Sequence, residues 1–321
     1  MAAREPPTDD SPRPRVPSSG VWAPTVTFFD PDTDELDLDA QTRYFQYLAR
    51  HLTGLVVLGT NSETMLLTRE ERAAMLRAAR HAVGPGYELM AGVSGHSTRQ
   101  VLEYIGDAAA AGADYALLLP CAYFGKQTTP QVVVDFYDQV APKSALPINF
   151  PGVCNGVDLS SDTIIDLQRR HPNIVGTKLT CASIGKLTRL ASELPRDRFA
   201  VFAGQGDILL AGLTAGGAGA ISGLANVYPR TLRRIHALHV AGDAEGAAGL
   251  QRVAARGERL GLNGGVPATK YAAALTTACA AGVRDAEARL RPRRPYAELS
   301  EGQKEEVRRT MEEMVAVEET L

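Results

Sequence analysis

The chain has 321 residues, of which 45% are hydrophobic, so it can bury the core of one α/β barrel with an appendage or of two average domains. Its 34 basic and 37 acidic residues give a net charge of −3, and no long basic stretch indicates binding to nucleic acid or to a membrane surface. No segment approaches the roughly 20 apolar residues of a membrane span, and the N-terminus lacks the apolar core of a signal peptide. We therefore expect a soluble, cytoplasmic protein that binds a small molecule.

The four cysteines have neither paired spacing nor the spacing of metal ligands. They are Cys121, Cys154, Cys181 and Cys279. Free thiols in a reducing compartment are the expected state, with no metal ligands among them. No metal and no cofactor is predicted.

Residues 1–19 are rich in proline and lack hydrophobic periodicity, which predicts a disordered tail outside the fold. From residue 20 onward, short β-rich runs alternate with helical patterns, as in parallel strands joined by crossover helices. Eight strands are predicted, over residues 21–29, 54–59, 87–93, 115–120, 147–150, 174–180, 199–204 and 219–224.

Several of the helices between these strands have recognisable first residues. Thr68 to Glu71 and Ser97 to Gln100 both have the pattern of a capping box, which satisfies free amides at a helix N-terminus. Other helices are predicted to begin near Pro130, Ser160, Ser183 and Pro229.

Eight strand–helix units within about 225 residues have the size and period of a (β/α)8 TIM barrel. We assign this barrel to residues 20–242. An open doubly wound sheet is the competing fold, but the glycine-rich dinucleotide fingerprint does not follow the first strand. Residues 243–321 are predicted to form a C-terminal helical appendage. Its last helix has a capping box at Ser300 and one apolar face made by Val307, Met311, Met314 and Val315.

Lys178 is the most informative residue, because it lies within an apolar run from Ile174 to Thr180 that predicts a buried strand. The chain has only six lysines beside 28 arginines. Burial disfavours a charged amine, and a neutral amine is a nucleophile. An edge strand with the lysine reaching water is the structural alternative. In a barrel, active sites lie at the carboxyl ends of the strands, where this lysine falls.

Three further segments contain glycine or small polar residues after predicted strands. The segment from Gly59 to Thr64 could hold a carboxylate with its amides and hydroxyls. The other two, residues 202–207 and 216–222, are glycine-rich. Each segment alone is equally well explained as turn residues or close packing.

In their order, these four stretches resemble the dihydrodipicolinate synthase and N-acetylneuraminate lyase family of Schiff-base aldolases over about residues 20–290. The family's Gly-Thr/Ser-Thr/Asn-Gly-Glu loop is matched from Gly59 to Glu63, and its Ile-x-Gly-x-Lys strand from Ile174 to Lys178. Its Gly-Gly-x-Gly-x-Ile-Ser segment is matched from Gly216 to Ser222. Within the family, Thr180, Cys181 and residues 149–156 look most like the fungal 2-keto-3-deoxy sugar acid aldolases, and the mitochondrial-type 4-hydroxy-2-oxoglutarate aldolases are a slightly more distant likeness.

The resemblance implies a role for each matched residue. Lys178 would form an imine with a 2-oxo acid, with pyruvate as the common fragment. Thr60 and Asn61 would bind its carboxylate, and Gly204 and Ile221 would line the pocket. The family also suggests a homo-oligomer, a dimer or a tetramer.

The chain departs from the family where a proton is transferred. The family's tyrosine at the end of strand five is replaced by Ile148, which would line the pocket instead. A second tyrosine, which many members take from a neighbouring subunit, corresponds to Ala122 or Tyr123, and we assign it to Tyr123. The arginine that binds the second substrate of dihydrodipicolinate synthases is absent from residues 153–155, which disfavours lysine biosynthesis.

Three functions are therefore open. The first is a pyruvate-type Schiff-base lyase. The second is an imine-forming enzyme with altered chemistry, namely a condensation, dehydration or decarboxylation. The third is a non-catalytic scaffold, which an intact Lys178 argues against.

Overall fold

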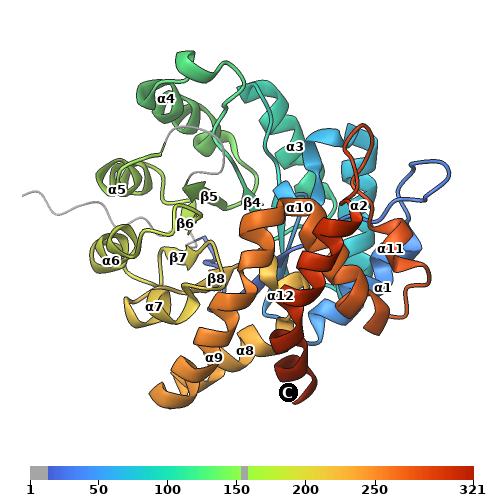
Figure 1. The fold of residues 1–321 in the computed structure, drawn as a ribbon. Helices are drawn as coiled ribbons and strands as arrows, with labels where there is room; N and C mark the ends of the chain where they lie inside the picture. Colours follow the sequence, from blue (N-terminus) through green and yellow to red (C-terminus); the bar gives the residue numbers. More distant parts are fainter. Residues whose placement is uncertain (1–13, 153–157) are drawn as a thin grey trace, which may run out of the picture.

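The computed structural model describes residues 14–152 and 158–321, without the side chains of residues 151 and 152. Eight parallel strands form a closed barrel in sequential order, with β8 hydrogen-bonded to β1 (Figure 1). This confirms the predicted TIM barrel. The strands are β1 (Gly20–Pro24), β2 (Gly54–Val57), β3 (Glu88–Gly92), β4 (Tyr115–Leu117), β5 (Ile148–Gly152), β6 (Ile174–Leu179), β7 (Ala200–Ala203) and β8 (Gly219–Ile221).

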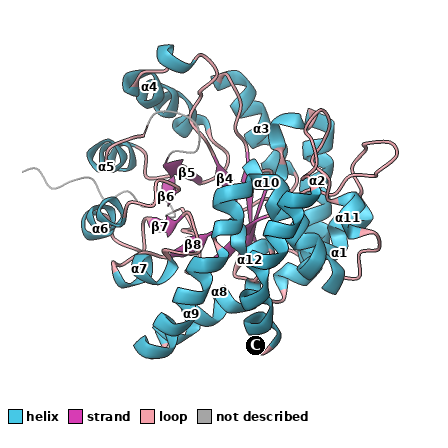
Figure 2. Ribbon diagram, viewed as in Figure 1, coloured by secondary structure: helices cyan, strands magenta, loops and turns pink. Residues whose placement is uncertain are grey.

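Helices surround the barrel of strands, and four more α-helices of the described chain follow the last barrel helix in the sequence (Figure 2). Those of the barrel are α1 (Leu38–Ala49), α2 (Arg69–Val83), α3 (Thr98–Ala110), α4 (Pro130–Val140), α5 (Ser161–Arg170), α6 (Ile184–Glu193), α7 (Leu209–Thr214) and α8 (Pro229–Val240). The C-terminal ones are α9 (Ala244–Gly257), α10 (Arg259–Ala273), α11 (Ala286–Arg289) and α12 (Glu301–Glu319). Short single-turn helices are η1 (Thr60–Ser62), η2 (Thr64–Leu66), η3 (Gly125–Gln127), η4 (Ala141–Lys143), η5 (Gly223–Asn226) and the π-helical η6 (Ala274–Ala278).

The predicted helix caps are present with one difference. Thr68 and Ser300 each form a complete capping box, at the starts of α2 and α12. Ser97 caps α3 by accepting a hydrogen bond from the Gln100 amide. The Gln100 side chain, however, accepts from the His96 amide at 2.8 Å instead of closing a capping box with Ser97.

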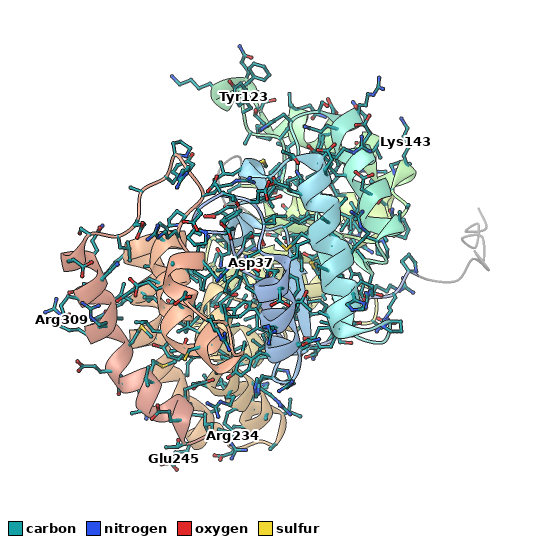
Figure 3. All side chains as sticks on the ribbon, turned by 90° about the vertical axis from the view of Figure 1, so that its right-hand side faces the viewer. Asp37, Tyr123, Lys143, Arg234, Glu245 and Arg309 are labelled. Carbon is teal, nitrogen blue, oxygen red and sulfur yellow. The ribbon has the colours of Figure 1, made fainter. Side chains whose placement is uncertain are left out.

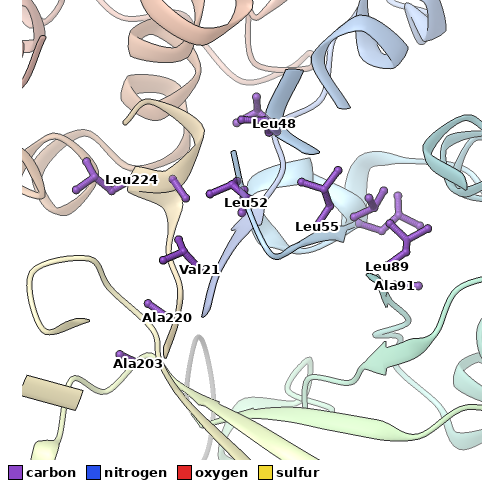
Figure 4. Packing of buried hydrophobic residues seen from close by; sticks show 14 of the residues in the cluster. Val21, Leu48, Leu52, Leu55, Leu89, Ala91, Ala203, Ala220 and Leu224 are labelled. Atoms are coloured by element: carbon purple, nitrogen blue, oxygen red, sulfur yellow. The ribbon is translucent and has the colours of Figure 1, made fainter. Parts of the chain in front are cut away.

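Two separate apolar clusters make up the hydrophobic core. The larger one lies between strands and helices and includes Leu48, Leu55 and Leu89 (Figure 4). The smaller one fills the barrel itself around Trp22, which is fully buried and meets Tyr115 and Phe202 edge-on at 6.2 and 6.1 Å. Trp22 requires glycine at position 54, because a Cβ there would lie 2.4 Å from the indole ring. A strand residue of the smaller cluster therefore points into the barrel, and a strand residue of the larger cluster points outward to the helices.

Residues 14–19 close the amino-terminal end of the barrel, which differs from the expectation that this segment lies outside the fold. Val16 packs against the interior cluster, and its carbonyl accepts a hydrogen bond from the Tyr115 hydroxyl at 3.2 Å. Arg15 forms an ion pair with the buried Glu88 at 2.6 Å. The buried Tyr115 hydroxyl also donates to Glu88 at 2.9 Å, so residues 14–19 add a cation, an amide and a carbonyl to an existing buried polar pair. Residues 1–13 lie outside the described part of the chain.

The C-terminal helices pack on the barrel and on one another, with α12 against α9 and α10. Val307, Met311 and Met314 are buried along α12, and Val315 is partly buried, as the predicted apolar face requires. Glu318 anchors the end of α12 by accepting hydrogen bonds from the amides of Arg230 and Thr231 at the start of α8. No helix in the described part of the chain has the length and apolar character needed to cross a membrane.

Candidate functional site

Lys178 points into the barrel because β6 contains a bulge. In the register with β7, Lys178 lies opposite Phe202 and Gly176 lies opposite Ala200, and both β7 residues belong to the interior cluster. Val175 belongs to the same cluster, so Val175 and Gly176 face inward although they are consecutive. The register between β5 and β6 shifts at this point. A bulge of this kind re-aims the residues that follow it.

Lys178 is partly exposed at the carboxyl end of β6, whereas the other residues of β6 are buried. Gly176 could not carry a side chain, since a Cβ there would lie 2.7 Å from both the Asn149 Nδ2 atom and the Ala200 carbonyl oxygen. Thr177 is buried opposite Val201 on the outer face. The amine therefore lies at the mouth of the barrel, on the end where TIM barrels carry their active sites.

On strand β5, Asn149 faces the barrel interior and Ile148 does not. Asn149 lies opposite Leu117 of the interior cluster, whereas Ile148 lies opposite Ala116 and is fully buried in the outer core. This corrects the prediction that Ile148 lines the substrate pocket, because alternation along the strand assigns it to the helix-facing side. Neither polar atom of the Asn149 amide has a hydrogen-bond partner among the described residues.

The loop after β2 holds Thr60 and Asn61 at the mouth of the barrel. Thr60 is exposed and opens η1. The buried Ser62 hydroxyl donates to the Thr25 carbonyl at 2.6 Å, which fixes the turn. The Asn61 amide lies beside Gly223, where a Cβ would be 3.0 Å from its Nδ2 atom. The loop after β2 therefore meets the start of η5, directly after β8.

Glu63 anchors the same loop to the C-terminal helices. It has a left-handed conformation, with φ of 55°, and accepts a hydrogen bond from the Lys270 ammonium of α10 at 3.0 Å. Lys270 is fully buried, also donates to the Arg291 carbonyl at 2.7 Å, and lies over the Phe29 ring at 4.7 Å. Burial lowers the pKa of Lys270 to about 8, and Glu63 opposes this shift.

A cavity of about 560 Å³ opens beside this loop. Thr60 and Tyr123 both line it, together with Glu63, Thr64, Met65, Leu66, Ser94, Gly95, His96, Leu119, Pro120, Ala122, Val266, Pro267, Pro292 and Tyr296. Tyr123 is 75% exposed, packs edge-on against His96 at 5.3 Å, and lies at the periphery of the molecule (Figure 3). Lys178 is not among the described residues that line this cavity. The structure thus groups Thr60 with Tyr123 in a cavity whose described lining does not include the amine.

Gly204 and Ile221 lie at the mouth of the barrel on the side of β7 and β8. A Cβ on Gly204 would lie 2.6 Å from the Thr180 Cα atom, so only glycine lets the end of β7 pack against the residue that follows β6. Ile221 is fully buried in the interior cluster. Gly204 therefore lies near Lys178 through its backbone, while Ile221 forms part of the apolar floor.

A carboxyl group at this end of the barrel has no sequence motif that predicts it. Glu258, at the junction of α9 and α10, is 6% exposed and accepts a hydrogen bond from the Gly206 amide at 2.9 Å. Burial, with a smaller contribution from the Asp207 carboxyl, raises the pKa of Glu258 to about 8, and the Gly206 amide and the positive charge of Lys178 act in the opposite direction. The charged neighbours Arg256 and Arg259 made Glu258 look like a surface residue.

The described residues contain no group of three or more histidine, cysteine or acidic side chains arranged to hold a metal ion. Cys121, Cys181 and Cys279 are free thiols, and Cys154 lies outside the described residues, as do all of residues 153–156 of the 149–156 segment used in the resemblance. The chemistry of the described site is that of an amine, two carboxyls and small polar groups.

The chain is similar to known proteins along most of its length. Residues 17–314 match the profile of the dihydrodipicolinate synthetase family. A Coccidioides immitis protein named as a mitochondrial 4-hydroxy-2-oxoglutarate aldolase is 57% identical over 309 residues, which is 95% of this chain and 98% of that protein. The L-threo-3-deoxy-hexylosonate aldolase of Aspergillus niger is 36% identical over 94% of this chain and 96% of its own length.

A solved structure has the same fold. The crystal structure of a dihydrodipicolinate synthase family protein from Coccidioides immitis superimposes with a TM-score of 0.91 at 53% identity, covering 96% of this chain and 99% of that one.

The names of the relatives contradict the expected cytoplasmic location. The Coccidioides relative, and one from Emericella nidulans that is 41% identical over 81% of this chain and 85% of its own length, are both named as mitochondrial proteins. Charge and composition carried no information on the compartment.

Proposed function

The chain belongs to the dihydrodipicolinate synthetase family and is a lyase of the aldolase type, and from this premise we propose that Lys178 forms the imine with its substrate. The substrate we propose is a 4-hydroxy-2-oxo acid that is cleaved to pyruvate and an aldehyde. This chemistry agrees with the names of the two aldolase relatives, a 4-hydroxy-2-oxoglutarate aldolase and an L-threo-3-deoxy-hexylosonate aldolase.

The placement of Lys178 is the observation that carries the proposal. Its side chain is directed into a closed barrel, opposite Phe202, and yet it is partly exposed at the carboxyl end of β6. Partial exposure at this position gives a ketone access to the amine. A lysine enclosed on all sides could not meet a substrate.

The proposed reaction uses the imine as an electron sink. The Lys178 amine attacks the ketone carbon, water leaves, and the protonated imine withdraws the electron pair of the bond between carbons 3 and 4. Thr60 and Asn61 bind the carboxylate in this proposal, since hydroxyl and amide groups at the start of η1 can hold an anion. Such positioning reduces the entropy cost of bringing the ketone to the amine.

Borohydride trapping tests the proposal. The protein is incubated with pyruvate, reduced, and measured by intact mass, and the expected result is one adduct that is absent in Lys178→Ala. Lys126→Ala is the matched control, because Lys126 is an exposed lysine near the mouth of the barrel. An adduct that persists in Lys178→Ala would assign the chemistry to another residue.

The same samples distinguish the other functions. An adduct together with released aldehyde from a 4-hydroxy-2-oxo acid supports cleavage. An adduct without cleavage supports the altered chemistry, namely condensation, dehydration or decarboxylation. No adduct with any 2-oxo acid tested would reject the imine altogether.

We further propose that the protein is a homo-oligomer, a dimer or a tetramer, and that Tyr123 acts across a subunit interface. Met65, Tyr123 and Phe124 are 53%, 75% and 69% exposed, and the first two line the cavity beside Thr60. Large apolar side chains exposed together are typical of an interaction surface. Light scattering should give a mass above one chain, and Tyr123→Asp with Phe124→Asp should lower it. A monomer at micromolar concentration would contradict this proposal.

A further inference from the structure

Aldol cleavage needs a group that exchanges a proton with the substrate hydroxyl, and the structure offers a carboxyl for this step. Ile148, at the position where the sequence resemblance expects the tyrosine of this family, points away from the barrel interior. We infer that Glu258 is the proton-transfer group of this enzyme. The inference rests on the proposed imine at Lys178.

Glu258 lies at the mouth of the barrel but belongs to the C-terminal helices, at the junction of α9 and α10. Its Oε2 atom accepts from the Gly206 amide at 2.9 Å, and a Cβ at Gly206 would meet this oxygen at 2.9 Å and the Ser222 hydroxyl at 3.2 Å. Gly206 follows the end of β7, and Ser222 follows the end of β8. Gly204 of the same loop packs on the Thr180 backbone, just after β6. The carboxyl therefore lies where the ends of β6, β7 and β8 meet.

The electrostatic surroundings suit a group that gains and loses a proton near neutral pH. The ionisable groups that act on Glu258 are Asp207, on the loop after β7, and Lys178, on β6. Burial and, to a smaller extent, Asp207 raise the pKa of Glu258 to about 8. The Asp207 Oδ1 atom is itself buried and has no hydrogen-bond partner among the described residues. Proton transfer is most efficient when the pKa of the group is near the working pH.

The proposed step is balanced in atoms and electrons. The Glu258 carboxylate takes the proton of the C4 hydroxyl, and the oxygen electrons form the aldehyde carbonyl. The bond between carbons 3 and 4 breaks, and its electron pair moves to the imine and gives a neutral enamine on Lys178. The protonated Glu258 then returns its proton to carbon 3, and water hydrolyses the imine and releases pyruvate.

The alternative is that Glu258 only holds the loop after β7. Gln251 of α9 already does this, since its amide donates to the carbonyls of Gly206 and Asp207 at 2.9 Å each and accepts from the Leu210 amide at 2.8 Å. A second holding group does not need an ionisable side chain. Glu258→Gln keeps an oxygen for the Gly206 amide and removes only the ability to transfer a proton, which separates the two roles.

The test follows deuterium incorporation into the methyl group of pyruvate in heavy water, together with borohydride trapping. Glu258→Gln should keep the Lys178 adduct and lose deuterium exchange and cleavage by about 10²–10⁴-fold. Gln251→Leu, which weakens the same loop, should lose less than about tenfold. In the wild type, cleavage under kcat/KM conditions should rise with pH towards about 8 as the carboxylate forms, and Glu258→Gln should lack this rise.

Each outcome decides the question. If Glu258→Gln exchanges deuterium and cleaves substrate at the wild-type rate, the inference is wrong. If Gln251→Leu and Glu258→Gln lose activity equally with the same pH profile, Glu258 is a structural anchor. Should Glu258→Gln not fold, Glu258→Asp gives the answer through its pH profile, since a shorter carboxylate with a different pKa should move the rising limb. A wild type that forms no adduct would instead reject the proposed imine and leave Glu258 without a reaction.

Discussion

Lys178 and Lys270 both lie within the fold, but their surroundings differ. Lys178 is partly exposed at the end of a strand and faces the inside of the barrel. Lys270 is fully buried in α10, where Glu63 and the Arg291 carbonyl accept its hydrogen bonds and Phe29 covers it. Burial alone therefore does not identify a nucleophile. The amine must also have a side from which a substrate can approach.

The buried pair also explains how the C-terminal helices contribute to the site. Glu63 belongs to the loop that carries Thr60 and Asn61, and Lys270 belongs to α10. The ion pair, at 3.0 Å, connects the two elements, and the Arg293 amide also donates to Glu63 at 3.3 Å. We interpret Lys270 as a positioning residue that holds the carboxylate-binding loop against the barrel. It acts through Glu63 and does not touch the substrate.

The largest difference between the two lysines should appear in activity. Lys178→Met should lower kcat by about 10⁴-fold or more, because removal of a covalent nucleophile leaves only binding and orientation. Lys270→Met should leave Lys178 able to form the borohydride-stable adduct, with kcat/KM reduced mainly through KM. Steady-state kinetics and intact mass on both variants check this. Equal losses of kcat would remove the functional distinction between the two amines.

Stability should show the opposite order. Lys270→Met leaves the Glu63 carboxylate buried without its cation, so the free energy of unfolding should fall by about 3–5 kcal/mol. Lys178→Met should change it by less than about 1 kcal/mol, and Lys143→Met, at an exposed lysine visible in Figure 3, should be close to neutral. Urea denaturation gives all three values. An unchanged free energy of unfolding in Lys270→Met would show that Glu63 finds another partner.

The smallest expected effect is the pH dependence of stability. Burial lowers the pKa of Lys270 to about 8 from an ordinary value of 10.5, so between these values the unfolded chain holds a proton that the folded chain has released. The stability advantage of the wild type over Lys270→Met should therefore increase as pH rises from about 8 to 10, on the order of 1–3 kcal/mol. Denaturation midpoints of both proteins at several pH values measure it. A constant or shrinking advantage would contradict the lowered pKa.

The repeated units of the chain made the barrel predictable. Alternating strand and helix patterns, with caps such as Thr68 and Ser300, specify local structure that the tertiary fold does not override. The loop containing Thr60 and the strand containing Lys178 could be found for the same reason, because each follows the repeat. The helical C-terminal region was predictable from its apolar periodicity.

Other features depend on contacts between distant segments. The inward direction of Asn149 and the outward direction of Ile148 follow from the register with β4, which a single strand does not encode. Glu258 meets Gly206 across 52 residues of sequence and has no motif of its own. Residues 14–19 have the composition of a tail, and only the fold shows that Arg15 and Val16 contact the buried pair of Glu88 and Tyr115. Each of these residues is defined by its neighbours in space.

Trp22, the single tryptophan of the chain, provides an optical reporter of the barrel. Its indole is fully buried and lies edge-on to Phe202, the residue opposite Lys178 in the strand register. This fluorophore therefore contacts a residue of the strand next to the proposed imine. Tryptophan emission should change when the barrel unfolds in denaturant and when a 2-oxo acid binds. The same fluorescence signal can therefore follow both unfolding and ligand titrations without a label.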